Sequence, residues 1–219
     1  MIEARLSELN KQAILYYLSW SGQGLDDYVC LQMDRCIQTV LDQSMPKLSY
    51  RIFTKEEIKS LSFQGKDVEK LSDDCEFVVL FGATIGNGIE RLLLQKEVLN
   101  MADALIMDAC ASCAIENVCD NFEMDLRMAY KKQGLYVSSR YSPGYGDFPL
   151  ESQIQFFDVL DLNRHLGLTL SDSYIMTPRK SVTALMAISK KPYVLRKNGC
   201  EQCDLFMQCA YRKEGKTCE

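Results

Sequence analysis

The 219-residue sequence predicts an α+β fold with a small cysteine-rich extension at its C-terminal end. Helical and strand-like segments alternate without the regular strand–helix–strand spacing of a doubly wound parallel sheet. The hydrophobic fraction of 47% and the charged fraction of 25% are those of a globular protein with one sizeable core. We therefore expect one domain over residues 1–195 and a separate tail over residues 196–219.

The first 45 residues are predicted to form two helices. The first helix is indicated by apolar residues at approximately helical spacing, and the Ser-Gly-Gln-Gly segment of residues 21–24 ends it. The second helix is expected over residues 25–43. The apolar residues that predict the first helix are Leu6, Leu9, Ile14, Leu15 and Leu18.

Two strands and two helices follow in the middle of the chain. Residues 48–54 alternate loosely between apolar and polar side chains, which is typical of a strand. Residues 76–83 form a near-continuous apolar run, which predicts a buried strand. A helix is expected over residues 89–101 and a longer one, or two joined ones, over residues 102–132. In the longer helix an apolar stripe facing the core is formed by Ala111, Ile115, Val118, Phe122, Leu126 and Ala129.

The last part of the predicted domain holds two strands around a loop and a helix. Residues 135–139 predict a short strand, which leads into a loop over residues 140–149. A helix is expected over residues 151–166, and Gly167 suits its C-terminal cap. Residues 182–189 predict the final strand.

Composition excludes several classes of protein. No apolar run is long enough to cross a membrane and no apolar signal core begins the chain, so we expect a cytoplasmic protein without membrane contact. The net charge is −5 and no basic stripe is present, which argues against a nucleic-acid partner. A single histidine, His165, leaves too few imidazoles for multi-histidine metal sites.

The most informative segment is the loop of residues 140–149. It contains three residues that constrain the backbone, Pro143, Gly144 and Gly146, together with two tyrosines. Such a loop is either a tight structural connection or a binding loop.

Arg140-x-x-x-Gly144-Tyr145, with Pro143 before the glycine, resembles the motif by which the activation domain of vitamin B12-dependent methionine synthase binds S-adenosylmethionine. Residues 167–182, 81–91 and 108–120 are similar to further segments of that family, in its stand-alone form. The resemblance implies an activation-domain-like fold. It also implies an S-adenosylmethionine site formed by Glu116, Arg140, Pro143, Gly144 and Tyr145.

The chemistry of three of these side chains suits that ligand. A guanidinium such as Arg140 can clamp the ligand carboxylate with two parallel hydrogen bonds. Glu116 could hold the ammonium group, and the ring of Tyr145 could lie against the sulfonium. The alternative for Glu116 is an ordinary ion pair with Arg140 or a lysine. After Tyr145 the chain reads Gly-Asp-Phe-Pro, where the intact synthase carries a Cys-Pro pair and a histidine.

The resemblance also implies a partner. The cobalamin-binding motif Asp-x-His-x-x-Gly does not match the sequence around His165, so we expect no corrinoid domain within this chain. Cobalamin would then be held in trans by a methionine synthase-like methyltransferase, with flavodoxin or ferredoxin as an electron donor. This reading makes the chain an accessory component of reductive remethylation. Two alternatives stay open: a Rossmann-type methyltransferase using the glycine-rich turn of residues 82–88, and a non-catalytic module that recruits a corrinoid protein.

Six of the ten cysteines form two groups of interest. Cys200, Cys203, Cys209 and Cys218 lie within a polar span, and four thiolates at short spacing suit zinc or an iron–sulfur cluster, with free thiols as the alternative. The Cys110-x-x-Cys113 pair lies in an alanine-rich apolar helix. We interpret this pair as small buried core residues rather than as a redox centre.

Overall fold

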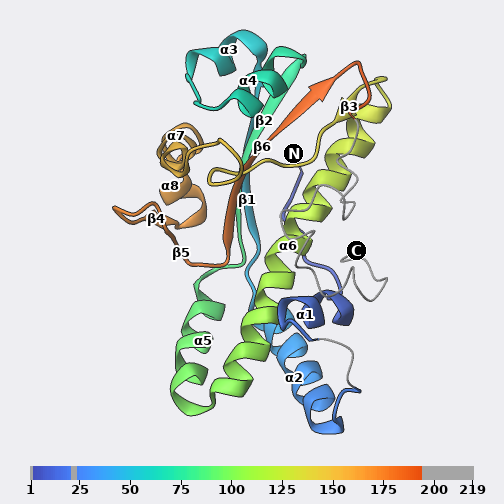
Figure 1. Cartoon of the computed structure of the whole chain (residues 1–219), viewed down its shortest axis with the longest axis vertical. Coiled ribbons are helices and arrows are strands. Elements are labelled where there is room, and N and C mark those ends of the chain that lie inside the picture. The colour runs from blue at the N-terminus through green and yellow to red at the C-terminus, as the bar shows by residue number, and fades with distance from the viewer. Residues whose placement is uncertain (1, 21–23, 194–219) are drawn as a thin grey trace.

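The computed structural model describes residues 2–20 and 24–193, and its centre is a four-stranded sheet with helices on both faces (Figure 1). The strand order is β1-β2-β6-β3, and every pairing is antiparallel. The strands are β1 (Lys47–Thr54), β2 (Phe77–Thr84), β3 (Tyr136–Val137) and β6 (Ser181–Ser189). A separate two-stranded ribbon joins β4 (Thr169–Leu170) to β5 (Met176–Thr177).

The two central strands, β2 and β6, are buried along almost their whole length. Successive side chains of a strand point to opposite faces, so a strand covered on both faces is apolar throughout. Phe81 and Met186 belong to the core on one face, whereas Leu80 and Leu185 belong to the core on the other. The apolar runs that predicted these two strands therefore reflect burial on both sides.

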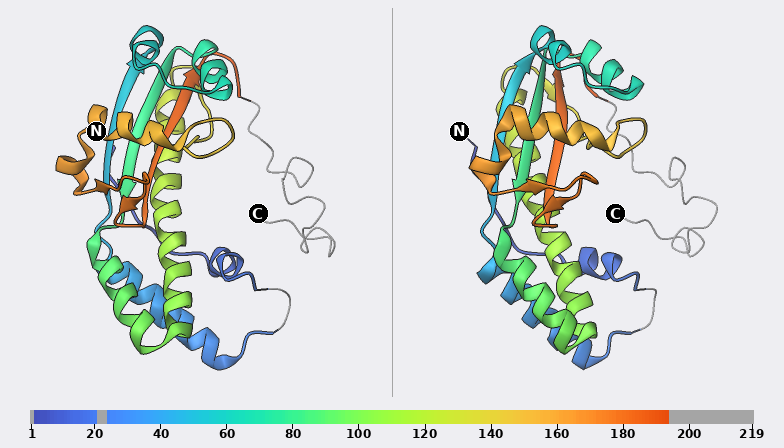
Figure 2. Two further views of the ribbon diagram at one scale, coloured as in Figure 1. Left: turned by 60° about the vertical axis from the view of Figure 1, so that its left-hand side comes forward. Right: turned by 90° about the vertical axis from the view of Figure 1, so that its left-hand side faces the viewer.

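One face of the sheet is covered chiefly by α6, a helix of 31 residues that runs the length of the molecule (Figure 1). Phe122 of α6 packs on Phe81 of β2 with ring centroids 5.0 Å apart. The first half of α6 also contacts α2 and α5, which form a helical layer with it (Figure 2). The helices of this layer are α1 (Lys11–Tyr17), α2 (Asp27–Gln43), α5 (Asn87–Leu99) and α6 (Met101–Lys131).

The opposite face is covered by shorter helices (Figure 2). They are α3 (Lys55–Ser60), α4 (Lys66–Asp73), a 3-10 turn η1 (Leu150–Ser152), α7 (Gln153–Leu160) and α8 (Leu162–Leu166). Phe148, which is fully buried, packs against Phe63 and Phe156 at centroid distances of 5.7 and 6.3 Å. This second core lies directly under the loop that the sequence singles out.

The predicted α+β class is confirmed, and several details of the elements differ from expectation. The segment 102–132 forms one continuous helix, but Ala129 is exposed, so the apolar stripe ends at Leu126. The helix expected over 151–166 is broken because Asp161 adopts a left-handed conformation, with φ 47°. The strand expected over 135–139 keeps only two residues in the sheet.

The first N-terminal helix is shorter than predicted, because it begins only at Lys11. The Asn10 side chain caps it by accepting a hydrogen bond from the backbone N–H of Gln12. The preceding residues are not helical, and they bind to the side of α6. The Asn121 side chain donates to the Arg5 carbonyl at 3.0 Å. The apolar spacing that includes Leu6 and Leu9 therefore does not mark a helix.

The glycine-rich turn of residues 82–88 is a structural connection between β2 and α5. The Met45 N–H donates to the Ile85 carbonyl at 2.8 Å, so the chain after α2 packs against this turn. The sheet beside the turn is antiparallel, whereas a Rossmann domain is built on a parallel sheet. The alternative of a Rossmann-type methyltransferase is therefore wrong.

The described residues contain no helix that is both long and apolar enough to span a membrane. The predicted tail of residues 196–219, including Cys200, Cys203, Cys209 and Cys218, lies outside the described residues.

Candidate functional site

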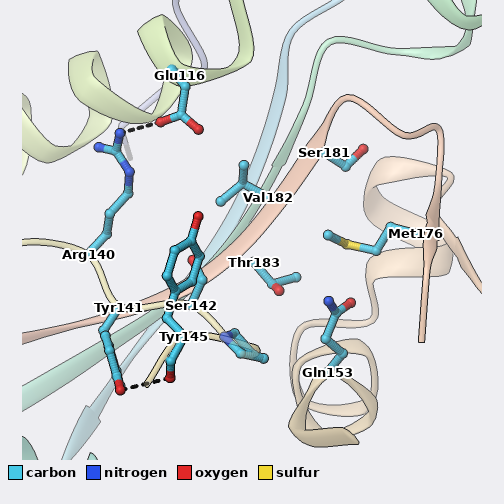
Figure 3. Close-up of a pocket in the computed structure, with 11 residues that line it drawn as sticks. Glu116, Arg140, Tyr141, Ser142, Tyr145, Gln153, Met176, Ser181, Val182 and Thr183 are labelled. Atoms are coloured by element: carbon cyan, nitrogen blue, oxygen red, sulfur yellow. Dashed lines mark hydrogen bonds and ion pairs between the residues drawn. The ribbon is translucent and has the colours of Figure 1, made fainter. Parts of the chain in front are cut away.

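A cavity of about 470 Å³ opens at the edge of the sheet, beside the N-terminal part of β6, which β3 does not cover (Figure 3). β3 pairs only with Ile188 and Ser189 of β6, and Tyr141 forms an isolated bridge to Leu185. The segment 181–183 of β6 is therefore left beside the cavity. The lining residues are Glu116, Arg140, Tyr141, Ser142, Pro143, Tyr145, Gln153, Met176, Ser181, Val182 and Thr183.

The cavity lies between the two layers of helices. Glu116 reaches it from α6 on one face of the sheet, and Gln153 reaches it from the first turn of α7 on the other face. The loop that begins at Arg140 passes across the gap between them (Figure 3). The topology thus brings together segments that are far apart in the sequence, which is a common setting for a small-molecule site.

Arg140 is held by three carboxylates of α6. Its Nη2 pairs with Glu116, and its Nη1 lies 2.6 Å from Asp120 and 2.9 Å from Glu123. These acidic residues recur at steps of four and three, so they share one side of the helix. Glu123 is buried and also pairs with Arg127. The guanidinium is consequently fixed in place at the mouth of the cavity.

Partial burial and the neighbouring carboxylates shift the pKa values of Arg140 and Tyr17. Burial alone would lower the pKa of Arg140, but Glu116 and Asp120 outweigh it and raise that pKa above its ordinary value, so Arg140 stays charged. The pKa of Tyr17, at the end of α1, is raised to about 12, first by burial and then by the negative charge of Glu116. The Tyr17 hydroxyl is therefore neutral at neutral pH.

The loop after Arg140 takes a shape that glycine makes accessible. Gly144 and Gly146 have φ values of 92° and 54°, in the region that side chains disfavour. The tight turn is closed by a hydrogen bond from the Gly144 N–H to the Phe148 carbonyl at 2.8 Å. Tyr145, a residue that is 68% exposed, projects from this turn into the open part of the cavity (Figure 3).

The second half of the loop is anchored to α4. The Asp147 carboxylate accepts hydrogen bonds from the backbone N–H groups of Lys66, at 2.6 Å, and Asp67, at 3.3 Å. Helix α4 has no side-chain cap of its own, because Gly65 precedes it. Asp147 and the buried Phe148 lie where the sequence departs from the Cys-Pro and histidine of the intact synthase. In this chain Asp147 holds the loop to α4 and Phe148 holds it to the core beneath.

The structure brings the predicted ligand-binding residues together. Glu116, Arg140, Pro143 and Tyr145 line one cavity, and Gly144 gives the turn between two of them its shape. The Glu116–Arg140 ion pair, which was the alternative interpretation, is present in this geometry.

Two residues that hold Arg140, Asp120 and Glu123, were not predicted from the sequence. The same is true of the cavity-lining residues Gln153, Tyr141, Ser142, Met176, Ser181, Val182 and Thr183. Glu116, Asp120 and Glu123 follow one another at helical spacing, so their carboxylates share one side of α6. This spacing was the available signal for Asp120 and Glu123. Nothing in the sequence around Gln153 distinguishes it from an exposed residue at the start of a helix.

The Cys110-x-x-Cys113 pair within α6 behaves as core residues. Cys110 and Cys113 are buried, and burial raises the pKa of the Cys110 thiol to about 12. A thiol with such a pKa is a poor nucleophile at neutral pH, in agreement with the structural interpretation. Among residues 2–20 and 24–193, no cluster of three or more histidine, cysteine, aspartate or glutamate side chains could hold a metal ion.

Comparisons with known proteins agree with this geometry. The family model of the vitamin B12 dependent methionine synthase activation domain matches residues 66–208. Among solved structures, the chain is similar to the MetH reactivation domain in its crystal structure with AdoHcy. That match has 17% identity and a TM-score of 0.60, and it covers 99% of this chain and 86% of the other. At this identity the likeness shows a shared fold. A search of curated proteins gave no significant match.

Because the family model covers well over half of its length, this chain belongs to the family of vitamin B12 dependent methionine synthase activation domains.

Proposed function

We propose that this chain binds S-adenosylmethionine in the cavity beside Arg140 and presents its methyl group to cobalamin on a partner protein. The observation that carries the proposal is the convergence of Glu116, Arg140, Pro143 and Tyr145 on one cavity at the sheet edge. Its volume of about 470 Å³ lies in the range of small-molecule sites. The structurally similar MetH domain was crystallised with AdoHcy, the demethylated form of the same ligand.

The ion pair between Glu116 and Arg140 suits an amino-acid ligand. The methionine end of S-adenosylmethionine carries both a carboxylate and an ammonium. When it enters, its carboxylate would bind Nη2 of Arg140 and its ammonium would bind Glu116. One internal ion pair is then exchanged for two with the ligand, and neither protein charge is left unpaired. Asp120 and Glu123 keep Nη1 in place during the exchange.

The remaining residues would position the sulfonium. The Tyr145 ring projects into the cavity, and aromatic faces attract cations. The cavity is open, so a partner can reach a ligand bound beside Tyr145. Cobalamin, held by the partner, supplies the cobalt nucleophile that accepts the methyl group. The chain itself then needs no general base, and its role is to bind and orient the donor.

The partner would be a corrinoid-binding methyltransferase of the methionine synthase type, served in trans together with a reductant such as flavodoxin or ferredoxin. The direct test mixes this protein, S-adenosylmethionine and a reductant with a methyltransferase whose cobalamin has been oxidised to the cob(II) form. We expect the visible spectrum of the partner to return to that of methylcobalamin. Omission of this chain or of S-adenosylmethionine should prevent the change.

The second candidate function is a non-catalytic module that recruits a corrinoid protein. Titration calorimetry with S-adenosylmethionine and S-adenosylhomocysteine separates the two. Binding of both ligands to the free, folded chain supports the proposed function. A folded chain with neither binding heat nor a ligand-induced rise in melting temperature would contradict it and favour the recruiting module.

A further inference from the structure

Gln153 is a buried polar side chain whose carbonyl oxygen is left without a partner. It is the first residue of α7, only 6% of its surface is exposed, and it lines the cavity. Its Oε1 has no hydrogen-bond partner among the described residues. Figure 3 shows its carboxamide directed from α7 toward Met176 and Thr183.

An unpaired buried amide is costly, because water that would have satisfied it is removed and nothing replaces it. Most buried polar atoms in proteins have a partner, so an exception in a cavity wall points to a partner that arrives with a ligand. The neighbouring Gln155 shows the contrast on the same helix, since its side chain donates to the Leu61 carbonyl at 2.8 Å.

Gln153 lies on the side of the cavity away from the charged residues. In Figure 3, Glu116 and Arg140 lie on one side, and Gln153 and Met176 lie on the other. If the amino-acid end of the ligand is held by the charged pair, its other end extends toward Gln153. That end of S-adenosylmethionine is the adenine base.

We infer that Gln153 is a specificity residue that recognises the 6-amino edge of the purine base; the inference rests on the proposed function. Adenine presents an amino donor beside a ring-nitrogen acceptor. A carboxamide presents an acceptor beside a donor, so the two pair through two hydrogen bonds. Because the carboxamide offers both, either orientation of its O and N atoms leaves an acceptor to meet the amino group. The polarisable thioether of Met176 is suited to contact the face of the base.

The test measures dissociation constants for two ligands on three proteins. The ligands are S-adenosylhomocysteine and its analogue that lacks only the 6-amino group. The proteins are the unmodified chain, the Gln153→Leu variant and the Gln155→Leu variant, which changes the same residue type on the same helix outside the cavity. Circular dichroism and a thermal melt check each fold, and Gln153→Met serves as a second variant with a flexible side chain.

The unmodified chain should prefer S-adenosylhomocysteine by roughly 10- to 100-fold over the analogue. Gln153→Leu should lose that preference, through weaker binding of S-adenosylhomocysteine, while Gln155→Leu should keep it. The free Gln153→Leu protein should melt no lower than the unmodified one, because the change removes an unpaired polar group.

A preference that survives in folded Gln153→Leu and Gln153→Met proteins would overturn the inference and leave the proposed function standing. The same holds if the unmodified chain binds both ligands equally. If the unmodified chain binds neither, the proposed function fails and this inference falls with it.

Discussion

Asp147 accepts a hydrogen bond from the backbone N–H of Lys66 at 2.6 Å, across 81 positions of sequence. The carboxylate thereby caps helix α4 from the far end of the loop that borders the cavity. A helix start needs acceptors for its first N–H groups, and Gly65 offers no side chain for this. The cap and the loop conformation therefore depend on each other.

The first prediction follows from this cap. Asp147→Ala should lower the free energy of unfolding by about 1 kcal/mol, the usual value of an N-cap. Chemical denaturation monitored by circular dichroism measures the loss. Asp147→Asn keeps a carbonyl acceptor and should recover part of it. Equal stability of the Ala variant and the unmodified chain would show that the contact does not stabilise α4.

The second prediction compares two carboxylates that both bind Arg140. Glu116 lines the cavity and Asp120 does not. Glu116→Gln should weaken S-adenosylmethionine binding by about 1.5 to 3 kcal/mol, the value of a hydrogen bond to a charged group. Asp120→Asn should leave the affinity nearly unchanged, because this side chain is 65% exposed. Calorimetric titrations of both variants measure the difference, and equal losses would mean that Glu116 acts only through Arg140.

The third prediction concerns Arg140 itself. Arg140→Ala should cost about 2 to 5 kcal/mol of binding free energy for S-adenosylmethionine, since a buried charge pair with the ligand is lost. It should also lower the melting temperature, because Glu123 is buried and loses one of its two cationic partners. Arg140→Lys keeps the charge without the planar fork and should restore stability better than affinity. Unchanged affinity in a folded Ala variant would remove Arg140 from the site.

The fourth prediction concerns thiol reactivity. Burial raises the pKa values of Cys110 and Cys119 to about 12, so their thiolate fraction is negligible at pH 7 to 8. Alkylation with iodoacetamide followed by mass spectrometry should leave both unmodified in the native protein. Both should react after denaturation. Rapid native labelling of Cys110 would mean that α6 opens locally.

The fifth prediction is that Cys200, Cys203, Cys209 and Cys218 bind one metal centre, which remains a prediction from sequence alone. Elemental analysis of anaerobically purified protein tests it. About one zinc per chain would indicate a structural site of four thiolates. Several irons with sulfide would indicate a cluster. Absence of both metals, with four freely titratable thiols, would contradict the prediction.

The sequence predicted the parts of the fold that burial dictates. Strands β2 and β6 and helix α6 were found because their apolar patterns are long. Helices α3 and α4 were not predicted, since they are short and contribute one buried side chain each, Ile58 and Val68. The capping box of Thr54 and Glu57 was the available signal for α3.

The sequence pointed to the loop motif of the candidate site but not to the residues that other elements bring to the cavity. Arg140, Gly144 and Tyr145 are close in sequence, so a short pattern was enough to propose them, and their part in ligand binding stays a prediction. Gln153 joins them only because α7 packs on the opposite face of the sheet from Glu116, and this depends on tertiary structure. The break at Asp161 was not predicted either, since an aspartate adopts the left-handed conformation only occasionally.

The position of the cavity at the open edge of the sheet has a consequence for cooperativity. The two apolar cores are separated by the sheet, and α6 and α7 each belong to a different one. A ligand that contacts both Glu116 and Gln153 bridges these cores outside the sheet. Such a ligand binds only when both layers are folded, so it stabilises each layer against unfolding on its own. The two layers should then unfold together. Occupancy of the site would thus add a direct link between two layers that otherwise meet only through the sheet they share.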